Sequence, residues 1–121
     1  MDNSEISVDK VKVQIAIVDQ RIAQYRKEAT QILSKLKLQR EGIRKKKNQY
    51  QEKINNAHNS ITKRQLRKKR DQDIARRTTA KSSIEKKYAH KKEQIAKQVE
   101  KKSELKLFLA QLKAQSSTKR A

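Results

Sequence analysis

The sequence predicts an all-α protein that folds as a long antiparallel helical hairpin, a two-helix coiled coil. Three observations favour this fold. The chain of 121 residues has no Pro and one Gly, so little in it breaks a helix. An apolar stripe in its first half repeats every 3.5 residues on average, which is typical of a coiled-coil seam. The most turn-like stretch, residues 55–60, lies almost at the midpoint.

The expected order of elements follows directly from these features. We expect one helical coiled-coil unit over residues 1–121, with helix one over about residues 5–55, a turn over about 56–60 and helix two over about 61–115. Asn3 or Ser4 can cap the first helix, and acidic residues near them suit the positive end of its dipole. Residues 116–121 contain no apolar anchor, so we expect a frayed basic tail.

The first helix carries the clearer pairing seam. Alternate steps of four and three residues from Val11 reach twelve positions, of which ten are apolar or aromatic. A lone helix cannot bury such a stripe, so a partner helix must cover it. The ten apolar or aromatic positions of this seam are Val11, Ile15, Val18, Ile22, Tyr25, Ala29, Ile32, Leu36, Ile43 and Tyr50.

The seam of the second helix is weaker. Between Thr62 and Ser83 only Leu66 and Ile74 are bulky and apolar, so the seam there is nearly absent. Farther along, the same steps reach six apolar or aromatic positions: Ile84, Tyr88, Ile95, Leu105, Leu109 and Leu112.

The alternative architecture is a single long helix that dimerises. In that case the protein would be a homo-oligomer. The polar midpoint favours the hairpin. Lys63 and Arg64 argue against it, because they would lie in the first turn of helix two, where the helix dipole disfavours cations.

Positive charge dominates the composition. Lys and Arg number 33 against 13 Asp and Glu, a net charge of +20, and the densest part lies between Arg40 and Arg70. A turn at 57–59 would bring the basic tetrad 44–47 opposite residues 69–72, next to the second tetrad 67–70. A solvated charged face explains part of this pattern, but such faces normally intersperse both signs. We therefore expect a docking surface for a polyanion, made by these basic residues: Arg44, Lys45, Lys46, Lys47, Lys63, Arg64, Arg67, Lys68, Lys69, Arg70, Arg76 and Arg77.

Among polyanions, the sequence favours nucleic acid contacted through its phosphates. Tyr25, Tyr50 and Tyr88 fall on the seam, where a partner helix would hold them away from bases. The apolar face is too narrow for a helix that lies on a membrane. The sequence thus predicts a non-enzymatic protein that packages, coats or scaffolds DNA or RNA through backbone contacts.

No catalytic, cofactor or metal chemistry is expected. The chain has no Cys, His58 and His90 have no acidic cluster beside them, and Gly42 stands alone, which excludes a glycine-rich phosphate loop. A two-helix structure also offers no concave pocket for an active site. No apolar run is long enough for a membrane span or a signal peptide, so we expect an intracellular protein, cytoplasmic or associated with a nucleoid or virion.

In outline the chain also resembles a known group of proteins. Its length, its polar midpoint at residues 55–60 and its basic character are similar to those of the small coiled-coil stalk proteins of flagellar and type III secretion export ATPases. This resemblance implies a different function, an interaction protein that docks on an acidic protein partner such as the ATPase of an export apparatus.

Overall fold

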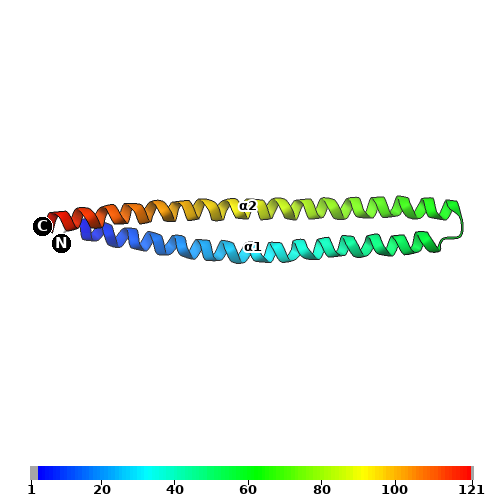
Figure 1. Ribbon diagram of the computed structural model, residues 1–121, viewed down its shortest axis with the longest axis horizontal. Coiled ribbons are helices and arrows are strands. Elements are labelled where there is room, and N and C mark those ends of the chain that lie inside the picture. Colours follow the sequence, from blue (N-terminus) through cyan, green and yellow to red (C-terminus); the bar gives the residue numbers. More distant parts are fainter. Residues whose placement is uncertain (1–2, 121) are drawn as a thin grey trace. The chain divides into compact units, whose positions relative to one another are not determined.

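The chain folds as a helical hairpin in the computed structural model, which describes the backbone of residues 3–120 and the side chains of residues 8–116. Helix α1 spans Asn3–Asn56 and helix α2 spans Ser60–Arg120, and the two helices pack against each other (Figure 1). The predicted all-α hairpin is therefore confirmed. The alternative of one continuous helix is wrong, because the chain reverses direction at residues 57–59.

The turn is defined by hydrogen bonds at both of its ends. The Ala57 N–H donates to the Ile54 carbonyl at 3.3 Å as α1 ends. Asn59 caps α2, because its Oδ1 accepts a hydrogen bond of 2.7 Å from the Thr62 N–H and its carbonyl accepts one of 3.2 Å from the Lys63 N–H. The first turn of α2 contains no acidic residue, and the Asn59 side chain is the acceptor for the Thr62 N–H there.

The outer ends of the helices differ from the sequence-based boundaries. α2 continues to Arg120, five residues beyond the expected end at 115, since residues 116–120 include neither Gly nor Pro. The side chains of the predicted caps Asn3 and Ser4, and those of the basic tail after Ser116, lie outside the described residues. Fraying of the tail stays a prediction.

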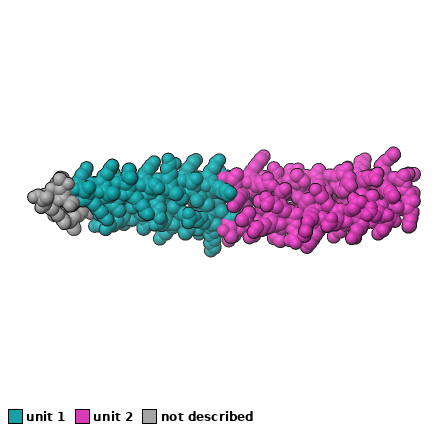
Figure 2. Space-filling view, in the orientation of Figure 1, with its two compact units in different colours: residues 1–29, 90–121 teal, residues 30–89 magenta. Residues whose placement is uncertain are grey.

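Two compact units make up the hairpin, and each contains part of both helices. Unit 1 comprises residues 1–29 and 90–121, and unit 2 comprises Thr30–Ala89 (Figure 2). Among the described side chains, the buried apolar ones all belong to α1: Val11, Val18, Ile22 and Ala29 in unit 1, and Leu36 and Ile54 in unit 2. The α1 stripe is thus the core of each unit.

In unit 1, α2 covers this stripe with apolar and charged side chains together. The apolar ones are half-buried: Ile95, Leu105, Leu109 and Leu112. On the same helix, Lys91 Nζ lies 2.6 Å from Glu28 Oε2 and Lys102 Nζ lies 2.6 Å from Asp19 Oδ1, so both lysines bind carboxylates of α1. Lys91 Nζ also lies 4.8 Å from the centre of the Tyr25 ring.

In unit 2, polar residues continue the α2 seam where the sequence shows almost no apolar seam. Arg70, Asp73, Arg77 and Lys81 are half-buried there, together with the apolar Leu66 and Ile84 that flank them. The methylene groups of long basic side chains can cover apolar surface while their charged ends reach water or a partner. This explains how α2 remains paired with α1 through residues 62–83.

Candidate functional site

The strongest candidate for a functional site is the basic surface of unit 2. All twelve basic residues singled out from the sequence fall within Thr30–Ala89. Unit 2 contains 19 Lys and Arg against 5 Asp and Glu, a net charge of +14, whereas unit 1 contains 14 against 8, a net charge of +6. Most of the surplus charge of the protein is therefore concentrated in one unit.

The twelve residues differ in how freely they reach solvent. Four of them are half-buried: Lys46, Lys63, Arg70 and Arg77. The other eight are exposed: Arg44, Lys45, Lys47, Arg64, Arg67, Lys68, Lys69 and Arg76. The exposed set supplies the ammonium and guanidinium groups that a large anion can contact directly.

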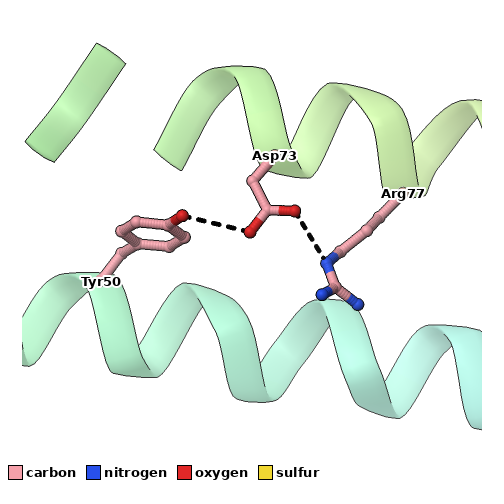
Figure 3. Close-up of polar contacts among 3 residues, drawn as sticks. All are labelled: Tyr50, Asp73 and Arg77. Carbon is pink, nitrogen blue, oxygen red and sulfur yellow. Dashed lines mark hydrogen bonds and ion pairs between the residues drawn. The ribbon is translucent and has the colours of Figure 1, made fainter. Parts of the chain in front are cut away.

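A polar cluster inside the seam holds one of the predicted residues. The Tyr50 hydroxyl on α1 donates a hydrogen bond of 3.1 Å to Asp73 Oδ2 on α2, and Arg77 Nε donates one of 3.0 Å to Asp73 Oδ1 (Figure 3). Arg77 is therefore a pairing residue of the hairpin as well as a member of the basic surface.

Titration of this cluster reflects the same contacts. Burial raises the pKa of the Tyr50 hydroxyl, and its hydrogen bond to the Asp73 carboxylate raises it further. Burial by itself would raise the pKa of Asp73, but the hydrogen bonds from Arg77 and Tyr50 outweigh burial and lower that pKa overall. Asp73 is thus a carboxylate at neutral pH, and it neutralises part of the charge of unit 2 from within.

Other acidic groups of unit 2 are also bound to its own basic side chains. Arg70 Nε lies 3.0 Å from Asp71 Oδ1, and Lys81 Nζ lies 3.5 Å from Glu85 Oε1. With Asp73, three of the five carboxylates are used in internal pairs. The exposed lysines and arginines consequently outnumber the carboxylates that could compensate them.

Two surface hollows in unit 2 are lined by basic residues. Lys69, Arg76 and Arg77 line one of them, beside Tyr50. Lys47 and Arg70 line the other, so a member of each basic tetrad borders the same hollow. The hairpin therefore brings the two tetrads, 44–47 and 67–70, near each other from opposite helices.

The pairing role of Asp73 and Arg77 is not evident from the sequence, which suggests only charge compensation for an aspartate inside a basic run. A signal is nevertheless present, because Asp73 follows Leu66 by one heptad and Arg77 precedes Ile84 by one heptad. Continuing the apolar frame through polar residues would have placed both side chains at the seam.

His58 lies exposed in the turn, and His90 lies exposed on α2. Among the residues that the structure describes, no group of three or more His, Cys, Asp or Glu side chains is placed to hold a metal ion. In the same part of the chain, neither helix contains an apolar stretch long enough to cross a membrane.

Comparison of the chain with protein-family models, with curated proteins and with solved structures gave no match.

Proposed function

We propose that this protein binds nucleic acid through the phosphate backbone and acts without catalysis, as a packaging, coating or scaffolding protein. The observation that carries the proposal is the charge of unit 2, where 19 basic residues face 5 acidic ones and three of those five are bound internally. Such a surplus repels itself, and a polyanion relieves the repulsion. Nucleic acid offers a dense, regular line of negative charge to do so.

The aromatic side chains favour contact with phosphates over contact with bases. Single-stranded nucleic acid is usually held by bases stacked on exposed aromatic rings. Here Tyr25 lies beside Lys91, and Tyr50 is half-buried and bonded to Asp73, while the exposed Phe108 belongs to unit 1 and not to the unit that carries the basic surface. Lysine and arginine heads remain as the contact groups, which gives binding that depends on salt and hardly on base sequence.

The test is to titrate the protein into labelled duplex DNA or duplex RNA and to measure binding by fluorescence anisotropy at several salt concentrations. The variant Arg44→Gln, Lys45→Gln, Lys68→Gln, Lys69→Gln removes four exposed charges from unit 2. Its matched control, Lys97→Gln, Lys101→Gln, Lys106→Gln, Lys113→Gln, removes four charges from unit 1.

We expect the unit 2 variant to bind more weakly to every duplex sequence. The slope of log affinity against log salt should fall by about 0.9 for each phosphate that the variant no longer neutralises. The unit 1 variant should keep most of the affinity. The proposal is wrong if the wild-type protein binds neither duplex at low salt, and its assignment to unit 2 is wrong if both variants bind equally weakly.

A second candidate function, docking on an acidic protein, is favoured by apolar side chains on the surface of unit 1. Val13 is 59% exposed, Ile17 is 42% exposed and Phe108 is 49% exposed. Exposed apolar groups next to positive charge suit an acidic protein partner better than they suit phosphates. Nuclease-treated pull-downs from the native source separate the two functions. A protein partner that Val13→Ser, Ile17→Ser releases and the unit 2 variant retains would support this second candidate.

A further inference from the structure

We propose that unit 2 bridges two nucleic-acid duplexes, with one duplex on each flank of the hairpin. This inference rests on the proposed function, because it assumes that the anion bound by the basic surface is nucleic acid. It adds that the basic surface of unit 2 is divided between two opposite flanks of the hairpin.

The division is visible in three consecutive residues of α2. Asp73 reaches across to Tyr50 on α1, so residue 73 marks the side of α2 that faces the partner helix. Gln72 lines the hollow that contains Lys69, whereas Ile74 lines the hollow that contains Lys47. Since successive residues of a helix are turned by about 100°, Gln72 and Ile74 point to opposite sides of Asp73. The two hollows consequently lie on opposite flanks of the hairpin.

Each flank has its own exposed basic residues. On the first flank Lys69 and Arg76 are one heptad apart on α2, and both line the first hollow. On the second flank Lys47 lines the hollow, and Arg40 lies one heptad before it on the same side of α1. All four side chains are exposed, and no residue lines both hollows.

A single duplex cannot occupy both flanks. Duplex DNA has a persistence length of about 50 nm, whereas a pair of α-helices is only about 20 Å across. A duplex seated on one flank therefore cannot bend around the helices to reach the other. The positive charge of the opposite flank remains free to take a second duplex, and the protein between them offsets their mutual repulsion.

The experiment uses two short duplexes, one with a donor dye and one with an acceptor dye, mixed with the full-length protein. Anisotropy reports binding, and energy transfer between the dyes reports bridging. The variants Lys69→Gln, Arg76→Gln and Arg40→Gln, Lys47→Gln each remove two exposed charges, one pair from each flank. Lys101→Gln, Lys106→Gln in unit 1 is the control, and circular dichroism checks that all variants keep their helices.

With the wild-type protein and the unit 1 control, we expect energy transfer that rises with protein and falls when protein is in excess. Each flank variant should still bind duplex, with its salt slope lowered by up to about 1.8 for two phosphate contacts, and should show only a small fraction of the wild-type energy transfer.

Three outcomes contradict the proposals in different ways. Absence of any anisotropy change rejects the proposed function itself. Wild-type binding without energy transfer leaves the proposed function intact and overturns bridging. Energy transfer that persists in both flank variants overturns the two-flank inference, because the bridge must then come from paired copies of the protein.

Discussion

The guanidinium of Arg77 on α2 lies against Gly42 on α1, so that a Cβ on residue 42 would stand 3.7 Å from Arg77 Nη1. Gly42 is the only glycine of the chain, and it lies in the middle of a helix without a positive φ. The distance is an ordinary van der Waals contact, so a methyl group at residue 42 fits without displacing Arg77. The same arginine is held at its other side by Asp73.

This geometry predicts that a small side chain at residue 42 stabilises the protein more than a large one does. Gly42→Ala should raise the free energy of unfolding by about 0.5–1 kcal/mol, because a glycine inside a helix is destabilising by that amount relative to alanine. Gly42→Leu also favours the helix but should displace Arg77 and lower stability below that of Gly42→Ala. Urea unfolding followed by circular dichroism measures both. If the Gly42→Ala protein were less stable than wild type, the inference that a Cβ at residue 42 fits beside Arg77 would be wrong.

The Asn59 cap gives a second prediction. Asn59→Ala should lower the free energy of unfolding by about 1 kcal/mol, because the Thr62 N–H then has no side-chain acceptor at the start of α2. Asn59→Asp should keep stability, since a carboxylate accepts the same bond and suits the positive end of the helix dipole. Asn48→Ala is the control, since Asn48 is an exposed asparagine inside α1 and does not cap a helix start. If Asn59→Ala and Asn48→Ala had equal stability, the cap would contribute nothing.

Much of the fold could be predicted from the sequence, because the apolar seam of α1 is recognisable in the sequence of that helix alone. Four-and-three spacing of apolar residues from Val11 to Tyr50 identifies a seam without reference to any partner, and the polar midpoint locates the turn. The α2 seam could not be predicted in the same way. Asp73 is recognisable as a seam residue only once Tyr50 is known to lie opposite it, and the register between the helices is not contained in either segment alone.

The candidate site was predictable in its location and not in its layout. A surplus of Lys and Arg between Arg40 and Arg77 is a property of the sequence, and it locates the basic surface within unit 2. Which flank each charge occupies depends on how α1 and α2 face each other. Lys69 and Arg70 are neighbours in sequence, yet they line different hollows.

Acid should weaken the hairpin through Glu28 and Asp73. Hydrogen bonds from Lys91 and then Gln24 lower the pKa of Glu28, and the bonds from Arg77 and Tyr50 lower the pKa of Asp73 against the effect of burial. A carboxylate with a pKa lowered by folding stabilises the folded state above its unfolded pKa of about 4, and this stabilisation disappears as the pH falls through the lowered value.

The expected result is a free energy of unfolding that falls as the pH drops from about 5 toward 2. Glu28→Gln should reduce stability at neutral pH and make the acid side of the profile shallower. Glu52→Gln, which removes an exposed carboxylate of α1, is the matched control. Urea unfolding at a series of pH values measures the slopes. Identical slopes for wild type and Glu28→Gln would show that the Lys91–Glu28 pair does not contribute to the acid dependence.

Salt should stabilise this protein, although it weakens the individual ion pairs of both units. The net charge of +14 in unit 2 repels itself, and raising the salt concentration from about 0.01 M to about 1 M shortens the screening length from about 30 Å to about 3 Å. We expect the Tm from circular dichroism to rise, by roughly 4 °C for each kcal/mol of repulsion removed. The Arg44→Gln, Lys45→Gln, Lys68→Gln, Lys69→Gln variant should start from a higher Tm at low salt and rise less. A Tm that falls with salt would mean that pairs such as Lys91–Glu28 outweigh the repulsion, and the surplus charge would then no longer require an anionic partner to relieve it.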